Sequence, residues 1–275
     1  MLTNQELTGI KELQDICEKE GYQLKLNFDM LENRKDGKKD DFFHYEDNLL
    51  VGFLGCYYFG SKVEICGMIH PDYRRKGIFS SLLKEALKEA KQRNASKVLL
   101  NAPSASISGK EFLRSVSCQY AFSEYQMKWQ ETELQENSTI ALRPYNYQED
   151  KEIEIQLDVQ GFGIDEKDAR EYVEEMMKND YDHRFIIEAE GRAAGKIRIS
   201  EVDREAWIYG FSIFPELRGK GIGRNVLVKV VKMEHEKGLP IFLEVEAKNA
   251  RALKLYESCG FRSYHSQDYY DYELL

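Results

Sequence analysis

The residues with the clearest chemical potential form a glycine-rich loop in front of an amphipathic helix. The loop reads Arg218-Gly-Lys-Gly-Ile-Gly223 and follows Pro215, at the end of an apolar segment. Glycine lacks a Cβ atom, so the backbone can turn tightly here and approach a ligand closely. The free N–H groups of a helix start, together with the helix dipole, favour an anion such as a pyrophosphate. Arg218, Lys220 and Arg224 place positive charge beside the loop.

The spacing separates this loop from two other phosphate-binding loops. A Walker A loop ends in Lys-Ser or Lys-Thr, whose hydroxyl holds magnesium, and no such pair follows the glycines here. A dinucleotide fingerprint follows an early strand and has an acidic partner about 20 residues later. This loop follows a late strand and lacks that partner. The sequence therefore disfavours nucleotide hydrolysis and hydride transfer.

The elements that must position the loop follow from hydrophobic periodicity and turn residues. In the C-terminal half the pattern predicts a strand at 139–145, helices at 148–159 and 165–178, strands at 183–189, 193–200 and 206–214, a helix at 222–237, a strand at 241–245, a helix at 249–258 and strands within 261–275. The glycine-rich loop thus lies between a strand and the helix that begins at Ile222.

The N-terminal half repeats this order at a distance of 144 positions. That shift places Ile69-His-Pro71 on Ile213-Phe-Pro215, and places Arg74, Lys76, Gly77 and Ile78 on Arg218, Lys220, Gly221 and Ile222. Helices predicted at 78–93 and 222–237 have equal length, and strand 98–100 falls opposite 242–244. Self-similarity of this kind predicts two copies of one domain. The first copy begins with a helix at about 5–20, capped by Thr3 and Glu6.

A polar stretch without periodicity separates the two copies. It covers residues 131–138, so the predicted domains are residues 1–130 and 139–275. Residues 1–130 carry a net charge of +1 and residues 131–275 a net charge of −10, which together give the total of −9. An acidic half argues against nucleic acid as the main partner, because phosphate binding needs clustered cations. It is compatible with a cationic amine.

Composition excludes several other classes of protein. The five cysteines are scattered without Cys-x-x-Cys spacing or a nearby histidine, so we expect buried free thiols and no metal site. The N-terminus has no basic segment followed by an apolar one, so a signal peptide is not expected. The longest apolar run, 49–59, is interrupted by glycines and is too short to span a bilayer. We therefore expect a cytoplasmic protein with no membrane partner.

Two motifs resemble those of the GNAT (GCN5-related) N-acetyltransferases. The segment Ile213–Arg224 is similar to motif A, whose signature is Arg/Gln-x-x-Gly-x-Gly/Ala, and Asn249–Phe261 is similar to motif B. One helix and one strand separate the two motifs, as in that family. The resemblance covers 139–275 well and 20–130 more loosely. The tandem layout is similar to that of mycothiol synthase, and the implied fold is α/β, with two GNAT-like domains that each have a mixed, mostly antiparallel sheet flanked by helices.

The resemblance implies where acetyl-coenzyme A, the cosubstrate, would bind. Main-chain N–H groups of the loop would hold the pyrophosphate, and the strand before it would bond to the pantetheine arm and the acetyl carbonyl. Asn249 would contact the coenzyme from the start of the next helix. The implied binding residues are Ile213, Phe214, Arg218, Gly219, Lys220, Gly221, Ile222, Gly223, Arg224 and Asn249.

Two residues are candidates for proton transfer. Tyr256, in motif B, would donate a proton or a hydrogen bond to the thiolate that leaves when an amine attacks the thioester. A lysine-like amine of pKa about 10.4 is only about one-thousandth neutral near pH 7, so a base or a water chain is also expected. Glu205 is the candidate base, and Tyr209 could order a water.

The N-terminal copy departs from the motif at two positions. Phe79 stands where the second copy has Gly223, and Phe112 stands where it has Tyr256. The first change puts a bulky side chain beside the predicted phosphate path, and the second removes the hydroxyl. We therefore expect no catalysis in this copy and a structural or substrate-shaping role, while coenzyme binding there stays open.

The resulting prediction is acetyl transfer to a primary amine of a small molecule or peptide by direct attack. Two alternatives remain open. One is a non-catalytic protein that binds or senses an acyl-coenzyme A. The other is transfer of a larger acyl group, or of an aminoacyl group from RNA, although the acidic C-terminal half argues against the RNA-dependent version. The acceptor and the oligomeric state are not predicted.

Overall fold

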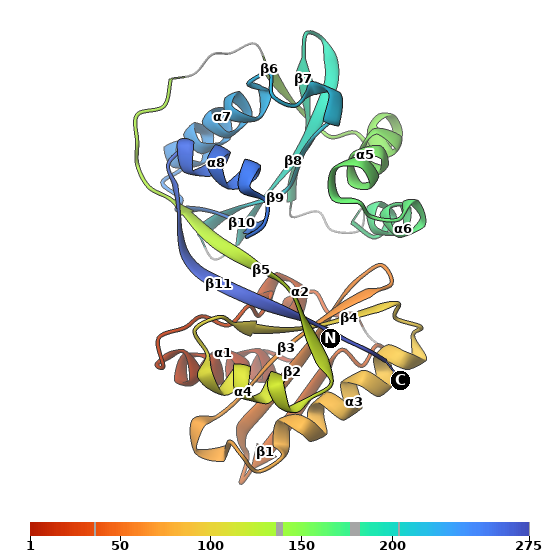
Figure 1. Ribbon diagram of the computed structural model, residues 1–275, viewed down its shortest axis with the longest axis vertical. Coiled ribbons are helices and arrows are strands. Elements are labelled where there is room, and N and C mark those ends of the chain that lie inside the picture. The colour runs from red at the N-terminus through yellow and green to blue at the C-terminus, as the bar shows by residue number, and fades with distance from the viewer. Residues whose placement is uncertain (36, 136–139, 177–181, 203, 275) are drawn as a thin grey trace. The chain divides into compact units, whose positions relative to one another are not determined.

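The computed structural model describes residues 1–35, 37–135, 140–176, 182–202 and 204–274, and Figure 1 shows it as a ribbon. It divides into two compact units. The first consists of Met1–Ser123 together with His265–Leu275, and the second of Glu124–Tyr264. Each unit has a mixed, mostly antiparallel sheet flanked by helices, which confirms the predicted fold class.

The first unit begins with a helix whose N-terminus has the predicted capping box, in which Thr3 and Glu6 bond to each other's main-chain N–H groups. Its elements are α1 (Asn4–Glu18), α2 (Phe28–Glu32), β1 (Asp41–Glu46), β2 (Leu49–Phe59), β3 (Lys62–Ile69), α3 (Ile78–Gln92), β4 (Lys97–Pro103) and α4 (Ile107–Ser115). Strands β1, β2 and β3 are antiparallel, and β4 runs parallel to β3. Helix α3 buries Leu82, Leu83 and Ala86 against this sheet.

The second unit repeats this arrangement. Its elements are β6 (Ile140–Pro144), α5 (Tyr147–Phe162), α6 (Glu166–Met176), β7 (Asp182–Ala189), β8 (Arg192–Val202), β9 (Glu205–Ile213), α7 (Ile222–Glu236), β10 (Ile241–Glu246) and α8 (Ala250–Ser258). Strands β6 to β9 are antiparallel, and β10 is parallel to β9. Figure 1 shows α5 and α6 on one side of these strands and α7 and α8 on the other. The apolar stripe of α7, which includes Val226, Leu227 and Val230, is fully buried.

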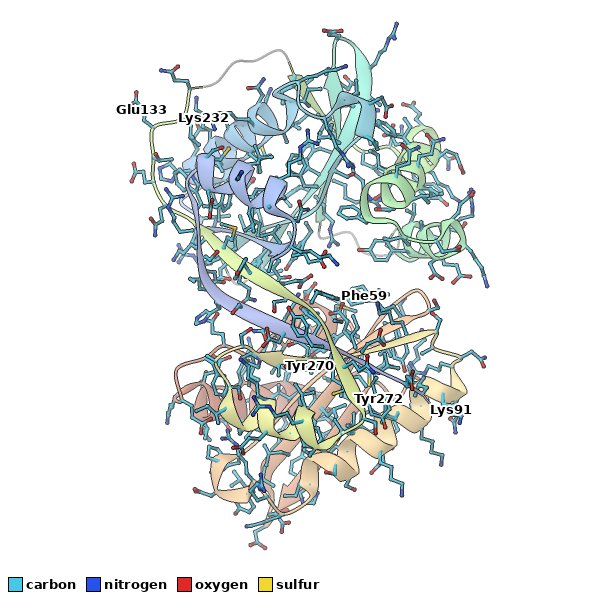
Figure 2. All side chains as sticks on the ribbon, in the orientation of Figure 1. Phe59, Lys91, Glu133, Lys232, Tyr270 and Tyr272 are labelled. Atoms are coloured by element: carbon cyan, nitrogen blue, oxygen red, sulfur yellow. The ribbon has the colours of Figure 1, made fainter. Side chains whose placement is uncertain are left out.

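Two long strands carry residues of both units. Strand β5 (Cys118–Trp129) pairs with β10 in the second unit, and β11 (Phe261–Tyr272) pairs with β4 in the first. Tyr270 and Tyr272, labelled in Figure 2, pack against the core between α3 and its sheet. Each unit therefore receives a strand from the other half of the sequence.

Because of this exchange of strands, the boundaries of the two units differ from the predicted domain boundaries. The sequence assigned residues 265–275 to the second domain, whereas their contacts place them in the first unit. An internal repeat shows that two copies exist, but it does not show which sheet a terminal strand joins. Residues 136–138 of the predicted linker, Thr139, and positions 177 and 178 of the predicted helix lie outside the described residues. The strands expected within 261–275 form a single strand, β11.

In the part of the chain that the structure describes, no helix is long and apolar enough to cross a membrane. The five cysteines are free thiols, and four of them are buried. Over the same residues, no group of three or more His, Cys, Asp and Glu side chains is arranged to hold a metal ion.

Candidate functional site

Strands β9 and β10 are paired over only part of their length. The parallel ladder joins Ala206 to Ile241, Trp207 to Phe242 and Ile208 to Leu243, and among the described residues it extends no further. Both strands continue beyond these pairs, so main-chain N–H and C=O groups along 209–213 face an opening in the sheet. Such a free strand edge can hydrogen-bond to an extended ligand.

A β-bulge lies on β9 at this opening. On the β8 side, Lys196 pairs with Ser212 and Arg198 with Tyr209, so β9 has one residue more than β8 between these pairs. Gly210 has a φ of +56°, which a glycine adopts without strain. Bulges redirect main-chain groups and occur often beside active sites. This bulge was not predicted, although a glycine inside a strand is a known signal for it.

The glycine-rich loop follows β9 after one 3₁₀ turn, Pro215–Leu217, and leads into the predicted helix. Gly219 and Gly221 have φ values of +80° and +81°, and Gly221 is the N-cap of α7, which begins at Ile222 as predicted. A Cβ atom on Gly221 would meet nothing within 4 Å, so the backbone there is uncovered. The first main-chain N–H groups of α7 are therefore open to an anion at the end of the strand opening.

The cations near the loop are arranged differently from the prediction. Arg218 donates from Nε to the carbonyl oxygen of Ile213 at 2.9 Å, and within the described ranges it pairs with no carboxylate. Arg224 instead bonds to Ser258 at the end of α8, at 2.8 and 3.0 Å. Arg251 was not predicted, yet its Nη2 lies 3.3 Å from where a Cβ of Gly219 would be. Arg218 and Arg251 are thus the cations beside the cradle, together with the exposed Lys220.

Tyr256 is held next to this loop by α8. A Cβ on Gly223 would lie 3.2 Å from Cδ2 of Leu255, so the two helices touch at the residue before Tyr256. The Tyr256 ring is buried, and it packs edge-on to Phe261 at 6.1 Å between centroids. Burial, together with the nearby Cys259 thiol, raises the pKa of the phenol to about 12. Asn249 caps α8 by accepting from the N–H of Ala252 at 3.1 Å.

Glu205 is not brought to the loop. It lies at the start of β9, where the ladder with β10 is closed, and its carboxylate accepts from Nε1 of Trp207 at 2.9 Å. It lies eight positions before Ile213 on an extended strand, a distance of about 26 Å. A direct role at the cradle is therefore ruled out by distance, and its role as a base stays a prediction.

A buried ionic network lies on the other side of β8 and β9 and was not predicted. Lys196 donates to Asp158 of α5 at 2.5 Å and to Glu154 at 3.4 Å, and Arg184 also bonds to Glu154. Burial raises the pKa of Asp158, although the Lys196 ammonium opposes this shift. Because Lys196 is paired with Ser212 beside the bulge, the network fixes α5 against the strand opening.

Replacing Lys196 by Met is expected to lower the free energy of unfolding of the second unit by about 3–5 kcal/mol, because two buried carboxylates lose their common cation. Denaturant unfolding followed by tryptophan fluorescence would measure the change, because both tryptophans, Trp129 and Trp207, lie in the second unit. Lys167→Met, which removes an exposed i,i+4 pair with Glu171, is the control and should cost less than about 1 kcal/mol. Equal stability of the two variants would contradict the structural importance of the network.

Comparison with known proteins identifies the family of the chain. A model described as "Acetyltransferase (GNAT) family" matches residues 7–107 and 144–261, which together make up more than half of the sequence. The chain belongs to the GNAT acetyltransferase family. Since one GNAT match falls in each copy of the internal repeat, the predicted tandem GNAT layout is confirmed.

Relatives and solved structures agree with this assignment. The "[Ribosomal protein bS18]-alanine N-acetyltransferase" of Escherichia coli (strain K12) is 32% identical over 78 residues, which cover 28% of this chain and 53% of that enzyme. The chain spans about half the length of such curated relatives. "Mycothiol acetyltransferase" of Saccharomonospora viridis is 26% identical over 221 residues, 71% of this chain and 70% of that protein. The GCN5-related N-acetyltransferase of Sphaerobacter thermophilus has the same fold, with a TM-score of 0.79 at 15% identity over 99% of this chain and 94% of its own.

Proposed function

We propose that the second unit of this GNAT protein binds acetyl-coenzyme A between β9 and β10 and transfers its acetyl group to a primary amine. The observation that carries the proposal is the conjunction of a strand opening, a bulge at Gly210 and an uncovered helix start at Gly221 along one path. An extended arm that ends in a pyrophosphate fits this path, because its amides can pair with a free strand edge and its phosphates with helix N–H groups.

The residues present suit the coenzyme. Main-chain groups of Ile213 and Phe214 would bond to the pantetheine arm, and the loop from Arg218 to Arg224 would hold the pyrophosphate. Arg218 and Lys220 would compensate its charge, together with Arg251, while Asn249 would act from the start of α8. Arg218 is the best placed of these cations, because it already contacts the Ile213 carbonyl and has no acidic partner among the described side chains.

The proposed reaction is direct attack. The amine nitrogen forms a bond to the thioester carbonyl carbon, the carbon–sulfur bond breaks, and the sulfur leaves as a thiolate. Tyr256 would donate a hydrogen bond to that sulfur as its negative charge develops. The proton of the attacking amine leaves through water, with Glu205 as its proposed destination. An unchanged kcat/KM in Glu205→Gln would remove Glu205 from this scheme.

The acceptor class is proposed from the family. The relatives above are named for the alanine of a ribosomal protein and for mycothiol, so their names give both a protein and a small-molecule acceptor. We propose an amine of one of these two kinds. A screen of peptide N-termini, amino acids, polyamines and amino sugars, read by free-thiol release, would identify it. Tight binding of acetyl-coenzyme A without turnover of any amine would favour the alternative of a coenzyme-sensing protein.

Gly221→Val is expected to weaken acetyl-coenzyme A binding at least about ten-fold. A β-branched residue is strained at a φ of +81°, so the helix start must move away from the phosphate path. Gly77→Val is the matched control, because Gly77 is the N-cap of α3 in the first unit with a φ of +79° and equally open surroundings. Isothermal titration with acetyl-coenzyme A measures both variants. Wild-type affinity in Gly221→Val would overturn the proposed site.

A further inference from the structure

The first unit has the same backbone arrangement as the proposed coenzyme site. The parallel ladder between β3 and β4 stops at Ile65 and Leu100 among the described residues, while both strands continue beyond it. Arg74 donates from Nε to the carbonyl oxygen of Ile69 at 3.1 Å, as Arg218 does to Ile213. Whether this second opening accepts a coenzyme depends on what lies in and around it.

The arginine beside the first opening is already neutralised by the chain. Arg74 donates from Nη1 to both carboxylate oxygens of Glu20, at 2.8 and 2.9 Å, and from Nη2 to the hydroxyl of Tyr22 at 3.2 Å. The carbonyl oxygen of Ile69 also accepts from the thiol of Cys17 at 3.5 Å. Arg218, by contrast, pairs with no carboxylate in the part of the chain that the structure describes. The Glu20 carboxylate thus pairs with Arg74, which would otherwise be available to a phosphate.

The segment after Glu20 continues across the opening. Tyr22, Leu24 and Leu26 are buried in the core that also contains Cys66 and Met68 of β3. The segment is therefore extended, with every second side chain turned into the unit.

Polar contacts tie this segment to both sides of the opening. The main chain of Lys25 hydrogen-bonds to the thiol of Cys66, the first residue of β3 beyond the ladder. The ammonium of Lys25 donates to the hydroxyl of Tyr269 at 2.8 Å, and Tyr269 pairs with Asn101, the first residue of β4 beyond the ladder. The carbonyl oxygen of Gln23 accepts from Gln267, also on β11, at 2.8 Å. One short segment is thus bonded on both flanks of the opening.

A phenyl ring covers β3 on the side of α3. A Cβ on Gly67 would lie 2.9 Å from Cε2 of Phe79 and 2.6 Å from the carbonyl oxygen of Phe53, so this strand position has no room for a side chain. The second unit reverses the arrangement: the ring belongs to Phe211 on the bulged strand, and the glycine, Gly223, lies on the helix, with a Cβ there 3.6 Å from Cζ of Phe211. In the first unit the ring thus comes from α3 and lies against β3 at Gly67, beyond the paired part of the strand.

We infer that the first unit is closed to the coenzyme by its own chain. Residues 20–25 hold the cradle arginine and span the opening, and the Phe79 ring lies on β3 beyond the ladder. One chain therefore binds one coenzyme molecule, in the second unit. This inference rests on the proposed function, because it presupposes a coenzyme in that unit. The first unit then has the GNAT fold, but its strand opening is not free to bind the coenzyme.

Titration calorimetry with acetyl-coenzyme A tests the inference. The wild type is expected to bind one molecule per chain, and Glu20→Ala/Phe79→Gly, which frees Arg74 and removes the ring that lies on β3, is expected to bind two. Glu85→Ala, which removes an exposed ion pair with Lys39 in the same unit, is the matched control and should bind one. Two molecules bound to the wild type, or one to the opened variant, would overturn the inference.

The same titration separates this inference from the proposed function. No binding to the wild type but one molecule bound to the opened variant would refute the site in the second unit and support closure of the first. No binding to either protein would refute both. Circular dichroism must show that the opened variant is folded. If it is not, Glu20→Gln is titrated instead, and its failure to bind a second molecule overturns the role of Glu20.

Discussion

Tyr256→Phe is expected to lower kcat about 100-fold, the typical cost of removing one hydrogen bond to a developing negative charge. The buried phenol has a pKa of about 12, so it is protonated throughout the physiological range and can act as a donor. The pKa of a free thiol is near 8.5, so a hydrogen bond to the sulfur is expected and a completed proton transfer is not. The affinity for acetyl-coenzyme A should change little, because the lost interaction forms only as the sulfur gains charge.

The control for this prediction is Tyr147→Phe, which removes the same hydroxyl from α5 in the same unit and should leave kcat unchanged. The pH dependence gives a second check. Activity should rise with pH until the acceptor amine has lost its proton, and loss of the Tyr256 proton should not lower it below a pH of about 12, since the acid form persists below its pKa. A falling limb near pH 10 that disappears in Tyr256→Phe, or an unchanged kcat in that variant, contradicts the proposed role.

Removing residues 265–275 is expected to unfold the first unit while leaving much of the second folded. Gln267 to Tyr272 pair with Val98 to Pro103 of β4, and Tyr269 is fully buried and stacked on Phe122 at 4.6 Å. Losing one buried aromatic side chain alone costs about 3–5 kcal/mol. Losing the strand also leaves the edge of β4 unpaired, so the total is comparable with the 5–15 kcal/mol by which a domain is typically stable.

Hydrogen exchange with peptide-level resolution measures this effect for each unit separately. Peptides from β2, β3 and α3 should lose protection in the shortened chain, and peptides from α7 and β8 should keep most of theirs. A chain that ends at Tyr272 is the control, because it keeps every residue that pairs with β4, and it should resemble the wild type. Full protection of the first unit without residues 265–275 would show that this strand is dispensable.

The parts of the site that local sequence controls were predictable. The start of α7 at Ile222 follows from glycine and arginine spacing, and the cap of α8 at Asn249 follows from the preference of asparagine for that position. The internal repeat predicted the order of strands and helices in both units, because each copy repeats the same periodicity. Tyr256 was predicted through motif B and its role stays a prediction, while the structure places its helix beside the loop.

The remaining features depend on residues far apart in the sequence. Arg251 reaches the loop only because α8 packs on α7, and the bulge at Gly210 is defined by the register with β8. The network of Lys196, Asp158 and Glu154 needs α5 to lie on β8, which no local pattern shows. Acidic residues on a helix normally face solvent, so sequence alone could not identify the buried ones.

The exchange of β5 and β11 has a consequence for how the protein is made. Ser104 of the first unit bonds to Asp268, a partner 164 positions later in the chain. On a ribosome, which adds about 5–20 residues per second, the first unit must therefore wait several seconds or more with the edge of β4 uncovered. Contacts at such separation also slow folding. The second unit is thus expected to finish folding before the first. The nascent first unit, with its exposed strand edge, is the part of the chain that most needs a chaperone.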